Sequence, residues 1–412
     1  MDQRAAGAAM GGAAEDRTAV QRARVAVAVV FALHGAVTGS FATRIPWMQE
    51  RLHLSSGELG VALMMPAIGA SLAMPLASRI VHRYGGRAAV RGLLALWCAA
   101  LALPAAAPGL PWFCPALLLF GATAGMADVA MNAQGVEVEQ RFGRSIMSGL
   151  HGMWSVGGLV ASGFGVLAAH AGIDARLHLG VMAALLVVGG RLVCRHLLDV
   201  RPAAEEEAPP RFALPPRSAL AIGLVGFCAV FAEGGSADWC AVYLRDITGA
   251  SAGVAAACYS GFAFTMAGAR LAGDAVVRRL GPVRTVRLSG AVATVGGLLV
   301  VVSESPALAI PGFALLGVGI AVVVPLAFAA AGKSGPNPSQ SIAGVATITY
   351  TSGLVAPAAI GLLAQATSLT VSFMLVTALV SALVLSAGAL RRAAVTVSAG
   401  AAAPSDTPAV SP

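Results

Sequence analysis

The polar residues best suited to chemistry lie inside long apolar stretches. Asp128 and Asn132 share one helical face with three glycines, because positions 121, 125, 128, 132 and 135 are spaced four and three residues apart. An ionisable group inside lipid costs about 2.5–3.5 kcal/mol. We therefore expect Asp128 to face a cavity or a partner. The alternative is a carboxylate that hydrogen-bonds across helices and serves only packing.

A second polar face starts at His151, with Trp154 beside it. One short loop joins this stretch to that of Asp128, and at 1.5 Å per residue Asp128 lies about 12 Å and His151 about 8 Å from the loop. The two side chains can therefore meet, and a carboxylate beside an imidazole can relay protons. The alternative is a histidine with a purely structural role.

Other apolar stretches carry further candidates. Glu233 lies about 22 Å from the inner end of its stretch, so we expect it to be buried and to join Asp128 and His151 in proton coupling. Asp238 can instead lie at the membrane interface, and Trp239 can belong to an aromatic belt. For His34, Tyr259 and Tyr350 the alternative is a role in helix packing. The candidates for lining a substrate cavity are His34, Asn132, Trp154, Asp238, Trp239, Tyr259 and Tyr350.

The composition predicts that lipid surrounds these stretches. Of 412 residues, 57% are hydrophobic and 11% are charged, against about 25% charged in a soluble domain. A soluble enzyme is thereby excluded. The net charge of +8 comes from basic residues placed between apolar runs, which argues against a nucleic-acid partner. The six cysteines show no CxxC spacing, so we expect no metal and no cofactor.

Twelve apolar stretches are long enough to cross a bilayer. Both termini are then on the same side, and basic residues mark the cytoplasmic side. With this topology 23 of the 27 basic residues are cytoplasmic, and the exceptions are Arg44, Arg51, Arg176 and Arg245. We expect a bacterial inner-membrane protein with cytoplasmic termini and predict spans at about 24–46, 57–79, 88–108, 112–136, 146–169, 177–197, 218–243, 252–276, 284–304, 307–330, 341–366 and 369–390.

The chain divides into two similar halves. An offset of 196 aligns Ser55 with Ser251, Gly85 with Gly281 and Gly121 with Gly317, which predicts a duplicated six-helix unit around a central path. We expect bundles at 24–197 and 218–390, joined by a Pro- and Glu-rich cytoplasmic linker at 198–217. Residues 1–23 and 391–412 are predicted to be disordered cytoplasmic tails.

The segment Gly268-Ala-Arg-Leu-Ala-Gly-Asp274, followed by Arg278-Arg279-Leu280-Gly281, resembles the signature between the second and third helices of each half in the major facilitator superfamily. The resemblance implies an all-α membrane fold of twelve helices in two pseudo-symmetric bundles. It also implies a cytoplasmic gate, which we assign to Arg83, Gly85, Arg270, Asp274, Arg279 and Gly281. The alternative is that these arginines only follow the positive-inside rule. The first half departs from the signature, with Ser78 at the Asp position.

The run Ala127-Asp-Val-Ala-Met-Asn-Ala-Gln-Gly-Val-Glu137 resembles the fucose permease branch of that superfamily. This implies proton coupling at Asp128, with Asn132 as its neighbour. We expect a monomeric secondary transporter that moves a small polar solute, such as a sugar, by proton symport. The alternative is proton-coupled export of drugs or amphiphilic metabolites. The chain has no Walker A, HExxH or GxSxG motif, so we do not expect an enzyme.

Overall fold

The computed structural model describes residues 3–142, 146–199, 217–331 and 338–390, and the regular structure within these ranges is helical. Backbone groups inside lipid must be paired within the protein, and an α-helix achieves this without a neighbour. The helices of the first half are α1 (Gln3–Ala42), α2 (Ile45–Leu52), α3 (Ser56–Tyr84), α4 (Gly86–Ala100), α5 (Leu103–Ala106), α6 (Leu110–Phe142), α7 (Met147–His170) and α8 (Ala175–Cys194). Those of the second half are α9 (Arg217–Asp246), α10 (Ala252–Leu280), α11 (Pro282–Val301), α12 (Pro306–Ile320), α13 (Val323–Ala331), α14 (Pro338–Ala366) and α15 (Leu369–Ser386).

These helices form twelve segments that are long and apolar enough to cross a membrane, counted over the described residues. Three of the segments are broken: α1 continues into α2, α4 into α5, and α12 into α13. A proline in the first turn of α2 and of α5 accounts for two of the breaks. The prediction of twelve spanning helices is confirmed.

The two halves repeat the same local devices at the predicted offset. Ser55 and Ser251 each cap a helix N-terminus through the hydroxyl, with φ/ψ of −63°/159° and −62°/158°. Gly85 and Gly281 each join two helices at φ of 81° and 74°, a region that favours glycine. The conserved geometry at equivalent positions supports a duplicated unit.

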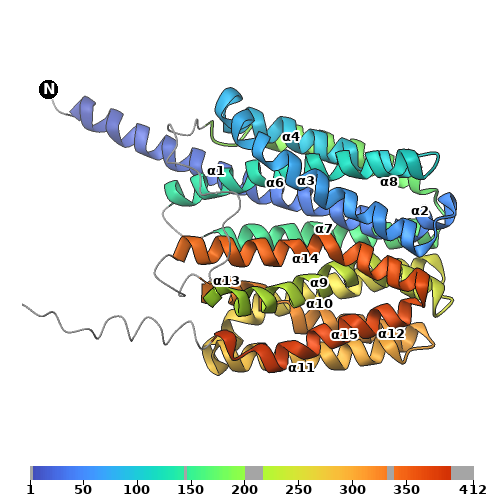
Figure 1. Ribbon diagram of the computed structural model, residues 1–412. Helices are drawn as coiled ribbons and strands as arrows, with labels where there is room; N and C mark the ends of the chain where they lie inside the picture. The colour runs from blue at the N-terminus through green and yellow to red at the C-terminus, as the bar shows by residue number, and fades with distance from the viewer. Residues whose placement is uncertain (1–2, 143–145, 200–216, 332–337, 391–412) are drawn as a thin grey trace, which may run out of the picture.

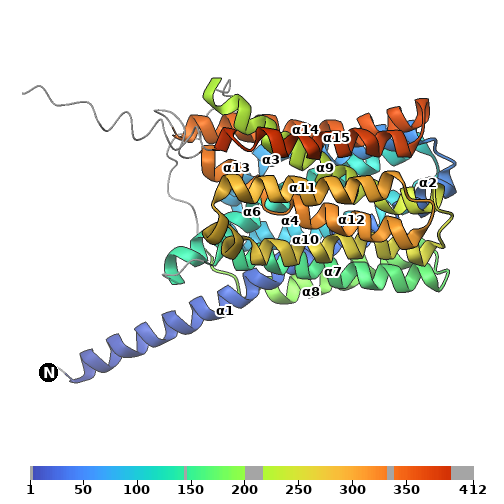
Figure 2. The same cartoon turned by 90° about the horizontal axis from the view of Figure 1, so that it is seen from below.

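The two bundles lie side by side with their helices running in a common direction (Figures 1 and 2). The start of α1 and the end of α15 lie at one end, which we call the terminal end. The opposite end, where α2 lies, is called the α2 end. Helix α3 packs against α14, and α7 packs against α10, across the boundary between the bundles.

The start of α1 differs from the prediction. Residues 1–23 were expected to be disordered, whereas α1 is helical from Gln3 and projects beyond the other helices (Figure 2). Alanine has the highest intrinsic helix propensity, which lets the spanning helix continue into this segment. Residues 200–216 of the predicted linker and the tail at 391–412 lie outside the described residues.

Candidate functional site

A cavity of about 680 Å³ lies between the two bundles. Its first-half wall comes from α1, α6 and α7, and its second-half wall comes from α9, α10 and the α12–α13 segment. The lining reaches Met147 at the start of α7 and Val277 near the end of α10, so the cavity extends to the terminal end. The ionisable or hydrogen-bonding side chains in its lining are His34, Asp128, His151, Trp154, Ser155, Glu233 and Arg270.

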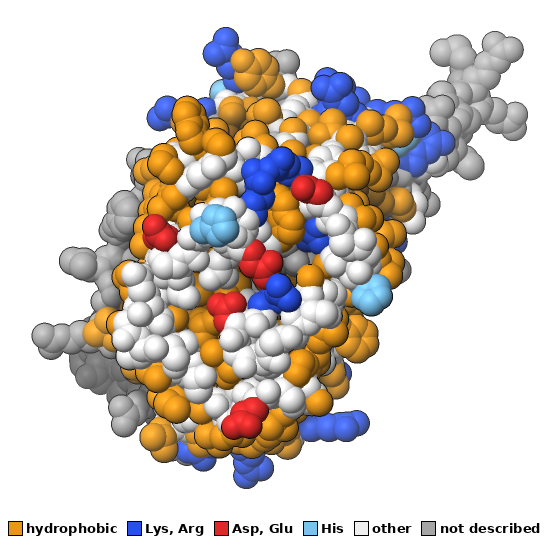
Figure 3. All heavy atoms as spheres, turned by 90° about the vertical axis from the view of Figure 1, so that its right-hand side faces the viewer, with side chains coloured by type: hydrophobic (Ala, Val, Ile, Leu, Met, Phe, Trp, Pro, Cys, Tyr) orange, Lys and Arg blue, Asp and Glu red, His pale blue; other side chains and the backbone are white. Residues whose placement is uncertain are grey.

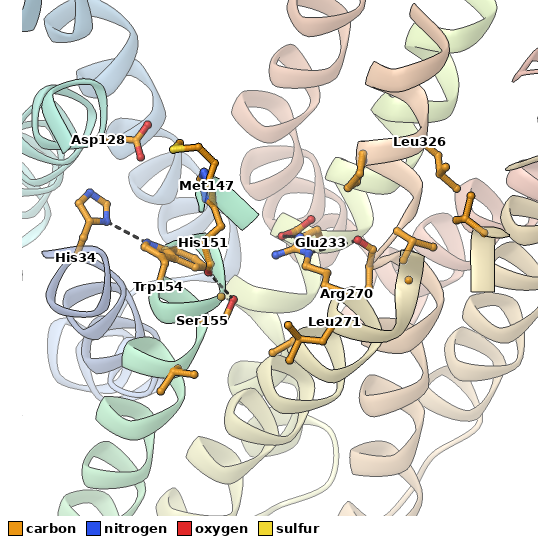
Figure 4. Close-up of a pocket in the computed structure, with 18 of the residues that line it drawn as sticks. His34, Asp128, Met147, His151, Trp154, Ser155, Glu233, Arg270, Leu271 and Leu326 are labelled. Atoms are coloured by element: carbon orange, nitrogen blue, oxygen red, sulfur yellow. Dashed lines mark hydrogen bonds and ion pairs between the residues drawn. The ribbon is translucent and has the colours of Figure 1, made fainter. Parts of the chain in front are cut away.

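Asp128 lies on the first-half wall and is directed into the cavity (Figure 4). One helical turn later, Asn132 donates from Nδ2 to the Asp128 carboxylate at 3.1 Å and to the Asp128 backbone carbonyl at 2.9 Å. Asn132 is not among the cavity-lining residues. Its amide therefore orients the carboxylate instead of facing a bound molecule, which differs from the prediction that it lines the cavity.

His34 is held by hydrogen bonds on both ring nitrogens. The Trp154 indole N–H donates to Nδ1 at 3.0 Å, and Nε2 lies 3.4 Å from the Ala124 carbonyl oxygen. An indole nitrogen only donates, so Nδ1 carries no proton in this arrangement and Nε2 is the donor. The ring is therefore neutral, and it orients Trp154 at the cavity wall.

Close backbone packing sets the position of Trp154. A Cβ atom on Gly35 would lie 1.9 Å from the Trp154 carbonyl oxygen, and one on Gly39 would lie 2.1 Å from that of Gly158. Only glycine allows α1 and α7 to approach this closely. The glycines of these two helices thus place the Trp154 side chain within reach of His34.

His151 lines the same cavity and is exposed to it. Its ring meets the Phe31 ring edge to face at 5.3 Å between centroids. Asp128 is close enough to His151 and to His34 to act on both imidazoles electrostatically. The predicted pair of Asp128 and His151 thus shares one cavity wall, with the Met147 side chain near both (Figure 4).

The second-half wall carries an ion pair that spans two helices. Arg270 of α10 donates from Nη2 to Glu233 Oε1 of α9 at 2.8 Å. Arg270 Nε also approaches the Ala321 carbonyl oxygen at 3.3 Å. Ala321 lies where α12 ends and α13 has not begun, so the interrupted helix leaves a carbonyl available to the guanidinium. Sequence reasoning placed Arg270 at a cytoplasmic gate, whereas its described contacts are in the cavity.

A smaller cavity of about 110 Å³ lies on the far side of Trp154 and of the ion pair, since both cavities share Trp154, Glu233 and Arg270 as lining. Tyr259 lines this second space, as does Thr38. Toward the α2 end the space closes where the Ser260 hydroxyl donates to the Ser162 hydroxyl at 2.8 Å.

The α2 end is closed by contacts between the bundles. A Cβ on Gly60 of α3 would lie 2.9 Å from the Gly361 Cα of α14, so these helices touch through their backbones. Arg245 of α9 meets Glu50 of α2, with Nη2 at 2.5 Å and Nε at 2.7 Å from Oε1. Acidic and basic side chains gather in the middle of this face (Figure 3).

Several predicted site residues lie away from the cavities. Trp239 is fully buried in the second bundle and packs against Gly361, so the prediction that it lines the cavity is wrong. Its neighbour Asp238 lines neither cavity, whereas the preceding residue, Ala237, lines the smaller one. Tyr350 is in α14 and Asp274 is in α10, but their side chains lie outside the described part of the structure.

The remaining gate candidates lie at the terminal end. Gly85 and Gly281 form the left-handed turns of the repeat. The guanidinium of Arg83 lies over the Tyr84 ring at 5.3 Å. Arg279 is exposed. The two glycines therefore form a turn, and the two arginines form part of a basic surface, at the terminal end of each bundle.

Three features of the site were missed from the sequence. They are the ion pair of Glu233 and Arg270, the hydrogen bond from Trp154 to His34, and the ion pair of Glu50 and Arg245. A signal for the first was present, because an arginine followed by two more turns of helix inside an apolar stretch requires a counter-charge. The partners of the other two pairs are 120 and 195 residues apart, and nothing in the sequence pairs them.

Comparison with known proteins identifies one family model and several similar transporters. Residues 27–357 match the family model of the Major Facilitator Superfamily. An uncharacterised transporter of Sinorhizobium fredii, y4wD, is 35% identical over 353 residues, which cover 85% of this chain and 93% of the relative. An uncharacterised MFS-type transporter of Yersinia pestis is 36% identical over 377 residues, covering 90% and 96% of the two chains.

Solved structures share the architecture at low sequence identity. A variant of the nucleoside transporter NupG superposes with a TM-score of 0.73 at 14% identity, covering 89% of this chain and 99% of that one. A bacterial homologue of the human lysosomal transporter Spinster, in an inward-facing and occupied conformation, gives a TM-score of 0.68 at 14% identity, over 90% and 96% of the chains. The twelve helices, the central cavity and these relatives lead to one conclusion: the chain belongs to the major facilitator superfamily and is a membrane transporter.

Proposed function

We propose that this transporter is a proton-coupled symporter that takes a small polar solute, such as a sugar, across the bacterial inner membrane. Both termini are cytoplasmic in this proposal, since the basic residues concentrate at the terminal end. The structure then corresponds to the inward-open state, because the cavity extends to the terminal end while the α2 end is closed. The two bundles rock about the cavity as units in a monomer.

The observation that carries the proposal is the difference between the two cavity carboxylates. Glu233 is paired with Arg270. A proton on Glu233 would leave the guanidinium without its counter-charge inside the membrane. Asp128 faces the cavity and has no basic ion-pair partner among the described residues. Asp128 is therefore the carboxylate that can take and release a proton without breaking an ion pair.

The charges of the cavity favour a solute without net charge. When Asp128 is protonated and His151 is neutral, the remaining charges are Glu233 and Arg270, which cancel. A neutral solute with hydroxyl groups can then hydrogen-bond to Ser155, Arg270 and the carboxyl groups at no electrostatic cost. A proton crossing 100 mV supplies about 2.3 kcal/mol, enough for roughly fiftyfold accumulation at one-to-one stoichiometry.

The test uses purified protein in vesicles under an imposed pH gradient, with a dye that reports internal pH and a panel of sugars and nucleosides. A solute that acidifies the vesicle lumen identifies symport. For that solute, Asp128→Asn should abolish uphill uptake but keep exchange between internal and external solute. Glu137→Gln is the matched control, since Glu137 is on the same helix and pairs with Arg141 outside the cavity. Uphill uptake at the wild-type rate in Asp128→Asn would remove Asp128 from the mechanism.

A second candidate function is proton-coupled export of amphiphilic compounds. The apolar lining of the second-half wall, which includes Leu271, Val277 and Leu326, favours it. These side chains offer a surface for a hydrocarbon body next to the polar groups of the first-half wall. Lipophilic cations in the same vesicles discriminate the two functions, because a cation driven against its gradient by protons supports export, and a sugar that carries protons inward supports uptake.

A further inference from the structure

A groove of about 500 Å³ lies on the outside of the first bundle, between the first membrane turns of α1 and the end of α8. We call it the α1/α8 groove. Arg22 and Arg195 line it at one side, and Val25 and Leu192 line it about one turn further into the membrane. It is separate from both central cavities, which include none of these residues.

The groove lies at the depth where headgroups meet acyl chains. The spanning part of α8 ends at Cys194, directly before Arg195, and Arg22 comes just before the apolar run of α1 that starts at Val25. The apolar side chains point outward, since Val25 is 58% and Leu192 is 54% exposed. The groove therefore presents cations at the membrane surface and hydrocarbon below them.

The charge of the groove is of one sign. Its lining contains two arginines and His196 and includes no acidic side chain among the described residues. Arg195 donates from Nε to His196 Nε2 at 3.0 Å, which occupies one of its five N–H donors. The other donors of Arg195 and the guanidinium of Arg22 can bind a phosphate, whose oxygens match the fork of an arginine.

We propose that the α1/α8 groove binds one anionic phospholipid, with its phosphate between Arg22 and Arg195 and an acyl chain along Val25 and Leu192. The two-part surface selects this ligand. A free phosphate would leave the apolar part uncovered, and a zwitterionic lipid would bring a second cation to a cationic site. The site rests on the α1 and α8 geometry alone and is independent of the transported solute.

The experiment measures lipid binding to the full chain in detergent by native mass spectrometry, with dioleoyl phosphatidylglycerol as the probe and dioleoyl phosphatidylcholine as the neutral counterpart. The wild type should retain one phosphatidylglycerol in preference to phosphatidylcholine. Arg22→Gln with Arg195→Gln should weaken that binding by about fivefold per arginine and roughly thirtyfold for the pair, given the attraction of one basic residue to an anionic surface. The matched control, Arg284→Gln with Arg287→Gln, removes the same charge from exposed positions on α11 and should bind like the wild type.

Two further measurements test the lipid site in the wild-type protein. Dihexanoyl phosphatidylglycerol should bind more weakly than the dioleoyl form, because its chains cover less of the apolar part. Inorganic phosphate should not displace the dioleoyl lipid at millimolar concentration. Equal retention of both headgroups, equal loss in the α11 control, or displacement by phosphate alone would each overturn the assignment of a lipid site.

Discussion

Breaking the ion pair between Glu50 and Arg245 should open the α2 end. The pair joins α2 to α9, and Arg245 Nη1 also donates to the Ala250 carbonyl oxygen at 2.8 Å. The Arg245 and Glu50 side chains are 31% and 52% exposed, so the contact is worth about 0.2–1 kcal/mol after solvent screening. Glu50→Gln should therefore raise the population of the state that is open at the α2 end by at most about fivefold.

The assay follows access to the small cavity from the α2 side. A cysteine is introduced by Thr38→Cys, because Thr38 lines that cavity and is covered when the α2 end is closed. Its labelling rate by a membrane-impermeant thiol reagent reports opening. Labelling of the native cysteines should be slow, since five of the six are buried and the sixth is partly buried.

The controls separate the ion pair from general loosening. Exchange of the two charges, by Glu50→Arg with Arg245→Glu, should restore slow labelling because the attraction is retained. High salt should raise the labelling rate of the wild type and leave that of Glu50→Gln nearly unchanged. If Glu50→Gln labels at the wild-type rate, the pair does not hold the α2 end closed and the reasoning is refuted.

Three further outcomes are expected. Arg270→Gln should lower the free energy of unfolding by about 1–3 kcal/mol, because Glu233 loses its partner in a site where its side chain is only 30% exposed. Arg270→Gln with Glu233→Gln should recover most of that free energy, and thermal unfolding in detergent measures both variants. Trp154→Phe should cost about 1 kcal/mol by removing the donor to His34, and no effect on unfolding would show that this hydrogen bond is not formed. Gly361→Ala would place a Cβ 2.4 Å from a backbone oxygen of α3, so it should speed labelling at the α2 end, whereas unchanged labelling would mean that the helices do not close there.

The sequence was sufficient for the scaffold because each scaffold feature is local or repeated. Hydropathy and basic residues place the spans, and the offset of 196 finds the paired serine caps and the paired turns at Gly85 and Gly281. Each of these depends on the residue's own backbone conformation or on its neighbours within one turn. The cavity position of Asp128 followed in the same way, since an ionisable group inside lipid must face polar surroundings.

The cavity partners could not be predicted because they come together only when helices pack. Arg270 meets Glu233 across 37 positions in sequence, and Trp154 meets His34 across 120. Trp239 shows the opposite error: it was expected to line the cavity, yet its side chain is fully buried and lies against Gly361 of α14. Helix rotation about its own axis decides such cases, and apolar residues on nearly every side of these helices leave that rotation undetermined.

The glycine contact between α3 and α14 bears on how fast the bundles can part. At the contact of Gly60 with Gly361 the two backbones touch, so no rotamer has to be rearranged at that point when they separate. The two helices can therefore separate at this contact without leaving much empty space between them. The barrier to changing state is then set by the few polar contacts around that seam, so single substitutions there should tune the turnover rate while the stability of each bundle stays the same.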